Sequence, residues 1–240
     1  MSAIRIAITE KRYRAAGTGP GREIFRDFRL DVDAGAFVAL LGESGIGKTT
    51  LLNIVAGLDR DFRGDIRFGA DSPRLAYAFQ NPRLLPWRTV LQNVALPLPS
   101  GEEGRDQARA MLDEVGLAEL ADAYPERLSL GQQRRVALAR AFVIGPDVLL
   151  MDEPFVSLDE AGAARLRNLL RRLLVRRPAT VLFVTHDRRE AVELASRIVV
   201  LEGAPVRILR DMALELTAQE RATPSRIDEV RQALENPTVG

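Results

Sequence analysis

The residues with the clearest chemistry form a glycine-rich run that ends in lysine and threonine. The run fits the pattern G-x-x-x-x-G-K-[ST], and it lies between a strand-like segment, Phe37–Leu41, and a helix-like apolar segment, Leu51–Ala56. Glycine freedom lets successive backbone N–H groups face an anion at the positive end of a helix dipole. This context predicts a phosphate-binding loop rather than only a glycine-rich helix cap. Its residues are Gly42, Glu43, Ser44, Gly45, Ile46, Gly47, Lys48, Thr49 and Thr50.

Lys48 also stands out in the composition of the chain. Of 34 basic residues, only Lys11 and Lys48 are lysine. Because a compact ammonium and a planar guanidinium are not interchangeable, the lysine at position 48 indicates a chemical requirement. We expect Lys48 to act as a catalytic residue that reaches the β- and γ-phosphates of a nucleotide, and the Thr49 hydroxyl to ligate Mg²⁺.

Two adjacent carboxylates, Asp152 and Glu153, follow the apolar run Val148–Met151. The carboxyl end of a parallel strand lies beside the phosphate loop in an α/β sheet. Asp152 is therefore expected to hold Mg²⁺, directly or through water, and Glu153 to polarise the attacking water as a general base. Taken alone, the two carboxylates would fit an ordinary strand-to-turn transition; beside the phosphate loop, the functional interpretation is preferred.

The segment 128–135, LSLGQQRR, opens a helical pattern in which Ser129 and Gln132 fit a capping box. One interpretation is a well-capped helix, which local physics favours. The other is that the free N–H groups at this helix start bind an anion held by another subunit. The residues by themselves leave both interpretations open.

The hydrophobic pattern predicts an α/β chain with a mixed sheet core. Early strands carry the polar alternation of an antiparallel layer, whereas later ones are continuous apolar runs, as in buried parallel strands. Residues 86–144 read as an inserted helical subdomain. We assign one domain to residues 1–211 and a polar tail to 212–240, with a helix near Arg226–Leu234 and a loose end. The expected strands are Ile4–Ile8, Phe28–Val32, Phe37–Leu41, Ile66–Phe68, Leu75–Phe79, Val148–Met151, Val181–Val184 and Ile198–Leu201.

Bulk properties exclude several classes of function. The net charge of +1 gives no argument for nucleic acid, and the absence of cysteine excludes disulfides and thiolate metal sites. No apolar run approaches the roughly 18 residues of a membrane span, and the N-terminal residues lack the apolar core of a signal peptide. A membrane role would therefore require a partner protein.

Together these motifs resemble the ABC (ATP-binding cassette) ATPases, which are P-loop NTPases, over roughly residues 3–210. The segment 128–141, LSLGQQRRVALARA, resembles their signature motif, usually L-S-G-G-Q, and precedes the Asp152 strand as in the family. Further matches follow in family order. They are Gln80 of the Q-loop, Ser157-Leu158-Asp159 of the D-loop, the switch histidine His186 (the only histidine of the chain), and Tyr13 as the aromatic residue that stacks on adenine.

The resemblance implies a mechanism in which two cassettes close head-to-tail around two ATP molecules. Ser129, Gly131 and Gln132 would then contact the γ-phosphate of the partner's nucleotide, and Asp159 of the D-loop would also take part in binding the nucleotide. His186 would act catalytically by holding the γ-phosphate and the attacking water, although a satisfied histidine at a strand end is the plainer alternative. Gln80 would contact Mg²⁺ and link the nucleotide to a membrane partner.

Leu130 departs from the family pattern, because it replaces the first glycine of the signature pair. Leucine does not readily adopt the positive φ angles that glycine permits. We expect the motif to work if residue 130 has a negative φ, since Gly131 is kept.

The segment after Gln80 contains Leu84-Leu85-Pro86-Trp87 and a V-x-x-N-V pattern, Val90–Val94. It resembles importers of the nitrate, sulfonate and taurine group, and importers of other small organic ions share much of it. Trp87 and the two leucines would lie where the cassette meets the permease, unless they pack inside the helical insertion. Exposed apolar groups favour the first interpretation.

The resemblance implies a bacterial importer ATPase, cytoplasmic and peripheral on the inner face of the membrane. Its partners would be a second cassette, integral permease subunits and, indirectly, a periplasmic or extracellular substrate-binding protein. The alternative is a soluble ABC ATPase that takes no part in transport. A small GTPase is disfavoured because no N-K-x-D guanine-reading motif is present, and an exporter because no membrane span is fused.

Overall fold

The computed structural model describes residues 2–14, 21–221 and 223–235. They divide into two compact units, one from Met1–Ser72 with Thr180–Gly240 and one from Pro73–Ala179. Each unit combines strands with helices, which confirms an α/β chain. In the described part of the chain, every helix is too short or too polar to cross a bilayer.

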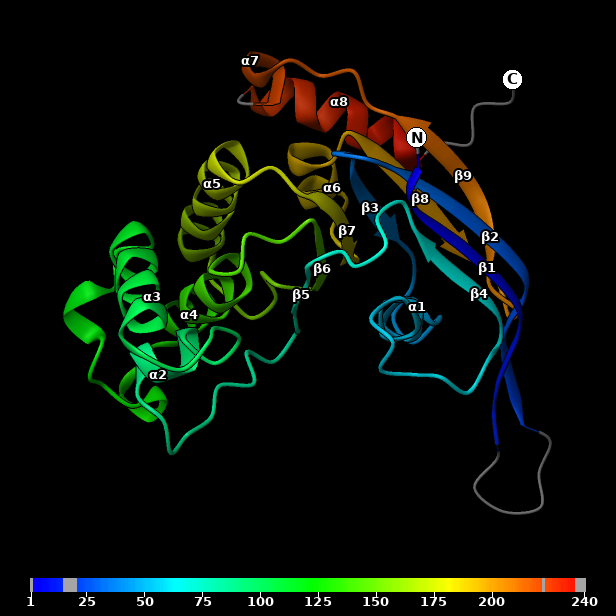
Figure 1. Ribbon diagram of the computed structural model, residues 1–240. Helices are drawn as coiled ribbons and strands as arrows, with labels where there is room; N and C mark the ends of the chain where they lie inside the picture. The colour runs from blue at the N-terminus through cyan, green and yellow to red at the C-terminus, as the bar shows by residue number, and fades with distance from the viewer. Residues whose placement is uncertain (1, 15–20, 222, 236–240) are drawn as a thin grey trace. The chain divides into compact units, whose positions relative to one another are not determined.

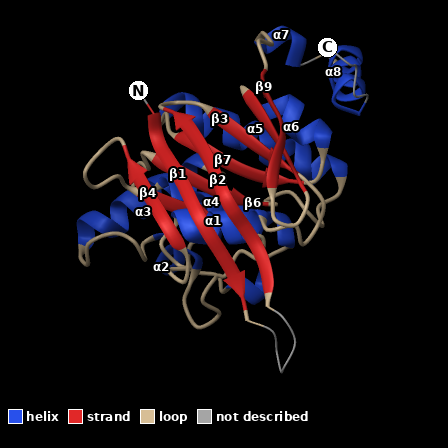
Figure 2. Ribbon diagram, turned by 90° about the vertical axis from the view of Figure 1, so that its right-hand side faces the viewer, coloured by secondary structure: helices blue, strands red, loops and turns tan. Residues whose placement is uncertain are grey.

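An antiparallel layer forms the N-terminal part of the first unit, as the sequence predicted. It contains β1 (Ser2–Tyr13), β2 (Arg22–Asp33) and β4 (Arg63–Phe68) in the order β2-β1-β4, seen side by side in Figure 2. Ile4, Ile6 and Ile8 of β1 are at most 1% exposed. Alternate residues of a strand face the same side, so these isoleucines anchor one face of the layer in the core.

The parallel strands of the first unit lie in the order β7-β3-β8. These strands are β3 (Phe37–Leu41), β7 (Thr180–Thr185) and β8 (Arg197–Glu202), and each contains its predicted segment. β9 (Arg207–Ala213) adds an antiparallel edge next to β8 that the sequence analysis missed. β9 crosses the boundary between residues 211 and 212 at which we expected the tail to begin. All of its residues are exposed or half-buried, so the strand exists through its pairing with β8 and not through a buried apolar face.

Four helices accompany these strands among the described residues of the first unit. They are α1 (Lys48–Val55), α6 (Arg188–Leu194), α7 (Ala218–Arg221) and α8 (Pro224–Glu235). α8 confirms the helix expected near Arg226–Leu234, and its Ile227 and Leu234 are buried as it packs on α6. The loose end expected after it lies outside the described residues.

The second unit joins a pair of parallel strands to a group of helices. β5 (Leu75–Ala78) pairs with β6 (Val148–Asp152). Residues 86–144, predicted to be helical, contain α2 (Val90–Val94), α3 (Glu102–Glu114), α4 (Leu130–Phe142) and two short 3₁₀ turns, Ala118–Leu120 and Pro125–Arg127. α2, α3 and α4 pack together, as Figure 1 shows, and α5 (Glu160–Arg176) packs on α4.

Asn93 of α2 holds the loop that contains Trp87. It is fully buried, and its Oδ1 accepts a hydrogen bond of 2.8 Å from the Leu85 N–H. Its Nδ2 lies 3.0–3.1 Å from the carbonyl oxygens of Leu85, Arg88 and Thr89. One side chain thus forms hydrogen bonds with four backbone groups of this loop, two of which, the Leu85 and Thr89 carbonyl oxygens, also accept from the Arg88 and Asn93 N–H groups.

Replacing Asn93 by leucine should therefore destabilise the protein. The change keeps the side-chain volume but removes the hydrogen bonds to the Leu85 N–H and to three carbonyl oxygens. A buried donor or acceptor that is left without a partner costs about 1–3 kcal/mol. We expect a lower midpoint in urea unfolding, measured with Gln107→Ala on the exposed side of α3 as control. Equal midpoints for the two variants would contradict the role given to Asn93.

Candidate functional site

The phosphate loop connects β3 to the first turn of α1. Gly45 has φ 76° and Gly47 has φ 131°, values that residues with a Cβ rarely adopt. A Cβ on Gly47 would lie 2.6 Å from Ile24 Cγ2, and a Cβ on Gly42 would lie 2.9 Å from the Leu201 carbonyl oxygen. Backbone conformation thus requires glycine at positions 45 and 47, and close packing requires it at positions 42 and 47.

Lys48 closes this loop with its own ammonium group. The side chain is 4% exposed, and Nζ donates to the carbonyl oxygens of Gly42 at 2.6 Å and Glu43 at 2.8 Å. Thr49 next to it is exposed, and Thr50 is half-buried. Because α1 begins at Lys48, the first N–H groups of the helix point toward the loop, so that an anion there would meet backbone donors and the positive end of the helix dipole.

Tyr13, at the end of β1, lies beside the same helix. Its hydroxyl is 3.2 Å from Thr50 Oγ1 and 3.3 Å from Asp59 Oδ2. The residue is 42% exposed. Position in the sequence alone suggested Tyr13, and the structure places its hydroxyl next to Thr50, the last residue of the phosphate loop.

His186 follows β7 and is exposed. It lines a pocket of about 480 Å³ together with Gly42, Glu43 and Ile46 of the phosphate loop. The next residue, Asp187, caps α6 by accepting from the N–H groups of Arg189 and Glu190. The first unit therefore brings together the phosphate loop, Tyr13 and His186, three features that lie far apart in the sequence.

Asp152 and Glu153 lie at the end of β6 in the second unit. Asp152 is 4% exposed and is the last residue of the strand. Burial raises the pKa of Tyr77 on the paired strand above its usual range, and the nearby Asp152 carboxylate raises it further. Glu153 has φ 42° and Ser157 has φ 65°. Such non-glycine values cost about 1–3 kcal/mol and cluster at functional sites.

The helix α4 begins as predicted. Ser129 accepts from the Gln132 N–H at 3.3 Å, and Gln132 Oε1 accepts from the Ser129 N–H at 2.8 Å, which confirms the capping box. Leu130 is the first helical residue, is 37% exposed and is not among the described residues with positive φ. The backbone condition for a working motif with leucine at 130 is therefore met.

Two arginines of α4, which the sequence analysis did not single out, connect this helix to neighbouring loops. Arg134 is 5% exposed and donates to the carbonyl oxygens of Phe79 at 3.4 Å and Val156 at 3.2 Å. Arg140 donates to the carbonyl oxygens of Pro82 and Arg83. Burial lowers the pKa of both guanidinium groups. The contacts tie α4 to both sides of Gln80 and to the segment before Ser157.

The second unit thus gathers the other predicted residues. β5 and β6 are parallel with Ala78 opposite Met151, so Gln80 and the Asp152–Glu153 pair leave the sheet at the same edge. Arg134 links that edge to α4, which carries Ser129, Gly131 and Gln132. Asp159 instead caps α5, where its Oδ1 accepts from the Gly162 N–H at 2.8 Å.

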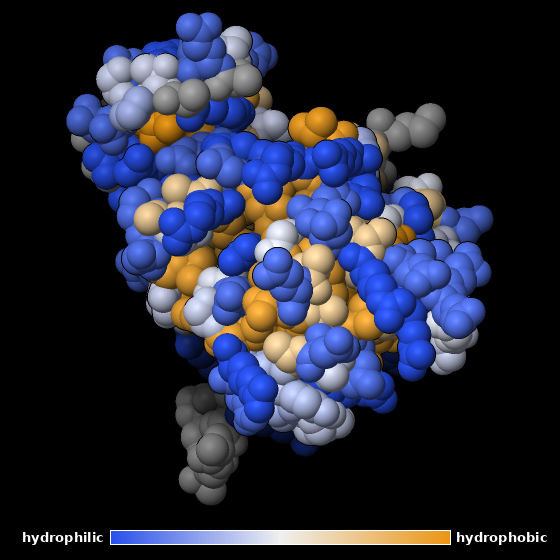
Figure 3. All heavy atoms as spheres, turned by 90° about the vertical axis from the view of Figure 1, so that its left-hand side faces the viewer, coloured by the Kyte–Doolittle hydropathy of each residue, from blue (hydrophilic) through white to orange (hydrophobic). Residues whose placement is uncertain are grey.

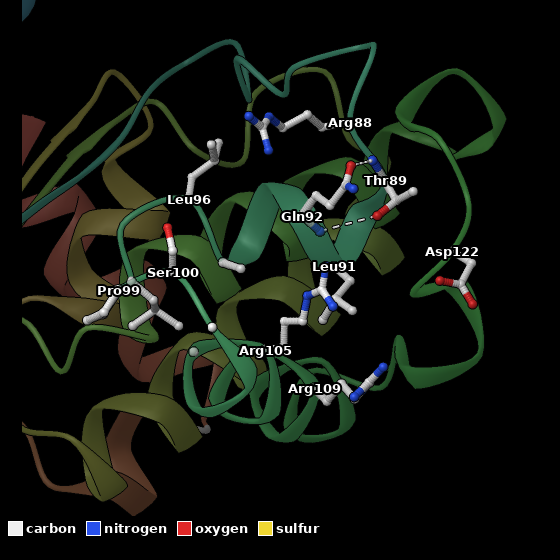
Figure 4. Close-up of a pocket in the computed structure, with 14 residues that line it drawn as sticks. Arg88, Thr89, Leu91, Gln92, Leu96, Pro99, Ser100, Arg105, Arg109 and Asp122 are labelled. Atoms are coloured by element: carbon white, nitrogen blue, oxygen red, sulfur yellow. Dashed lines mark hydrogen bonds between the residues drawn. The ribbon is translucent and has the colours of Figure 1, made fainter.

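A second surface feature lies between α2 and α3. A pocket of about 520 Å³ is lined by Arg88, Arg105 and Arg109, with Leu91 and Leu96 among its apolar residues (Figure 4). Trp87, adjacent in sequence, is 71% exposed, so it does not pack inside the helical insertion; Leu84 and Leu85 are half-buried. Viewed from the side on which Figure 1 draws α2 and α3, the surface shows apolar groups among hydrophilic ones (Figure 3).

Comparison with known proteins places this site in a family. The ABC transporter family profile matches residues 25–156. The aliphatic sulfonates import ATP-binding protein SsuB 1 of Streptomyces avermitilis is 46% identical over 214 residues, 89% of this chain and 80% of the relative. Its counterpart SsuB from Mycobacterium sp. (strain MCS) is 44% identical over 239 residues, 98% of this chain and 94% of the relative.

A solved structure shows the same fold. The dimeric post-hydrolysis state of the ATP-binding cassette MJ0796, bound to ADP and Pi, matches with a TM-score of 0.77 and 30% identity. The match covers 89% of this chain and 100% of that one. With its phosphate loop, its α/β fold and these relatives, the chain belongs to the ABC transporter family, as an ATP-binding and ATP-hydrolysing cassette of the P-loop NTPase fold.

Proposed function

We propose that the chain is the motor subunit of a bacterial importer that takes up a small sulfonate-like solute through a separate permease. The observation that carries the ATPase part is the glycine loop that presents the start of α1, with His186 in the same pocket. The relatives named as aliphatic sulfonates import proteins support the solute class. Taurine is itself a sulfonate, and nitrate is another small oxyanion.

Nucleotide binding would start with an exchange of partners at Lys48. Its Nζ now rests on the Gly42 and Glu43 carbonyl oxygens. Phosphate oxygens are stronger partners for an ammonium, because the resulting hydrogen bonds join opposite charges. Loop residues 42–50 would surround the phosphates with backbone donors, and Tyr13 would stack on the base.

Hydrolysis requires a base and a means of holding the attacking water. We assign the base to Glu153, whose strained φ fixes the direction in which the carboxylate leaves β6. His186, beside the phosphate loop, would hold the water and the γ-phosphate. Proton transfer by a positioned side chain of this kind contributes about 10²- to 10⁴-fold in rate.

The residues present fit a Mg²⁺ ion bound together with the nucleotide. Thr49, Gln80 and Asp152 offer hydroxyl, amide and carboxylate oxygens, the ligands that this cation prefers. Among the described residues there is no group of three or more His, Asp or Glu side chains that could hold a metal by themselves. When bound, the cation would share its coordination with phosphate oxygens and neutralise their charge.

A second cassette would complete the site. The start of α4 carries Ser129, Gly131 and Gln132, and a Cβ built on Gly131 meets nothing within 4 Å. The space beside Gly131 at this helix N-terminus would admit a phosphate of the partner's nucleotide. Asp159 would lie at the same interface, with the capping of α5 as its structural role.

The permease would dock between α2 and α3. Trp87 offers an exposed aromatic anchor, and three arginines line the adjoining pocket. An aromatic anchor beside arginines is typical of residues that dominate binding energy at protein interfaces. Docking there would hold the cassette on the inner face of the membrane, and a substrate-binding protein outside would deliver the solute to the permease. The alternative, an ABC ATPase without a role in transport, predicts no such partners.

Replacing Glu153 by glutamine tests the assigned base. The amide keeps the shape of the side chain but cannot accept the proton, so we expect ATP turnover to fall by about 10²-fold or more while ATP binding is kept. Phosphate release and equilibrium ATP binding measure the two effects. Lys48→Ala is the contrasting variant, since it should weaken ATP binding itself. Near wild-type turnover in Glu153→Gln would show that another group is the base.

Restoring glycine in the signature motif tests the departure at position 130. Because Leu130 already has helical φ, Leu130→Gly should change ATPase activity modestly, and part of any change should come from the lower helix propensity of glycine, about 1 kcal/mol. Steady-state ATP hydrolysis measures this, with Leu130→Ala as control. A large gain that only the glycine variant shows would mean that leucine impairs the native motif.

Docking through Trp87 predicts which proteins co-purify with the chain. From gently solubilised native membranes, a tagged chain should recover a multi-span permease, and Trp87→Ala should recover much less. Val175→Ala, which removes another exposed apolar side chain of the second unit, serves as control because Val175 is 83% exposed. Recovery of soluble proteins only would support the non-transport alternative. A co-purifying binding protein would then be screened with aliphatic sulfonates, taurine and nitrate.

A further inference from the structure

Lys11, the other lysine of the chain, is buried beside the tyrosine proposed to stack on the base. Only 2% of the residue is exposed, which is unusual for a lysine. Its Nζ donates to Asp59 Oδ1 at 2.8 Å and to the Asp61 carbonyl oxygen at 2.7 Å. The ammonium is therefore held in one place by a charged and a neutral acceptor.

The position in which Nζ is held lies over the ring of Tyr13. Nζ is 4.5 Å from the ring centroid, within the range of about 6 Å over which a cation is attracted to an aromatic face. Lys11 and Tyr13 are two residues apart on β1, so their side chains leave the strand on the same side. The ammonium covers one face of a ring whose residue is 42% exposed.

The edge of the same ring is held by the carboxylate that holds the lysine. Asp59 Oδ1 accepts from Lys11, and Asp59 Oδ2 accepts from the Tyr13 hydroxyl at 3.3 Å. The hydroxyl also lies 3.2 Å from Oγ1 of Thr50, the residue after the phosphate-loop threonine. Lys11 thus contacts the face of the ring, and Asp59 and Thr50 contact its hydroxyl group. Through Thr50 the position of the ring is coupled to that of the phosphate loop.

A purely structural role for Lys11 would be to fasten the turn at residues 59–61 to β1. That role needs a hydrogen-bond donor for Asp59 and Asp61, which an arginine could also supply, and 32 of the 34 basic residues are arginine. An ammonium differs because it is compact enough to place its whole charge over the ring while both acceptors are satisfied.

We propose that Lys11, together with Asp59, positions Tyr13 for stacking against the base of the bound nucleotide. Lys11 is a positioning residue in this arrangement: it touches the tyrosine and not the nucleotide. A ring held in its binding orientation before the nucleotide arrives loses less conformational freedom on binding. The proposal rests on the proposed role of Tyr13 in binding the base.

The test compares a ligand that has a base with one that has none. Affinities of the full chain for ADP and for inorganic pyrophosphate are measured by calorimetry, which avoids hydrolysis. Tyr13→Ala should weaken ADP binding by about ten-fold, the usual size of a base-stacking contribution, and leave pyrophosphate binding unchanged. Lys11→Met should do the same by about three- to five-fold, the size of a cation–π contribution, and Asp59→Asn by less. Arg5→Met, on the exposed part of β1, is the control.

Together the outcomes distinguish the positioning role of Lys11 from the role of Tyr13 in binding the base. If Tyr13→Ala leaves ADP binding unchanged, Tyr13 does not bind the base and both proposals are wrong. If Tyr13→Ala weakens ADP but Lys11→Met and Asp59→Asn do not, only the positioning role is wrong. Equal weakening of ADP and pyrophosphate in Lys11→Met would show that the lysine supports the fold alone. If Lys11→Met does not fold, the ratio of the two affinities in Asp59→Asn decides.

Discussion

The close packing at Gly47 is the constraint on which the nucleotide site depends. The residue precedes α1, and a Cβ there would collide with Ile24 of β2 and press against Val206 before β9. The antiparallel layer and the β8–β9 turn thus meet at the point where the phosphate loop becomes a helix. This contact fixes the position of the first N–H groups of α1, and an anion site made of backbone donors is only as well organised as that position.

In the second unit, the positions of the loops are fixed by side chains that form hydrogen bonds with backbone carbonyl groups. Asn93 organises the loop around Trp87, and Arg134 and Arg140 hold the segments on both sides of Gln80. Long loops without regular structure need such partners, because buried carbonyl and N–H groups are costly when unpaired. Arg134 and Arg140 thereby connect α4 to the loop that carries Gln80 and, through Val156, to the segment before Ser157.

Both lysines of the chain occupy buried positions in which a compact cation is required. Lys48 lies on the carbonyl oxygens of its own loop, where phosphates would replace them as partners, and Lys11 lies on an aromatic ring. The other 32 basic residues of the chain are all arginine. The scarcity of lysine in the sequence therefore indicated a specific role for the ammonium group at both positions, although from the sequence we inferred such a role for Lys48 only.

Features that depend on local pattern could be predicted from the amino-acid sequence. The phosphate loop, the capping box of α4 and eight of the strands could be read because strand, loop and helix signals extend over a few residues. The edge strand β9 was missed because its residues are half-buried at most and it exists only through pairing with β8. The strained φ of Glu153, the helical φ of Leu130 and the exposure of Trp87 also needed coordinates. Contacts between residues far apart in the chain, such as Lys11 with Asp59, became visible only in the folded protein, because spacing in the sequence does not indicate which distant side chains meet.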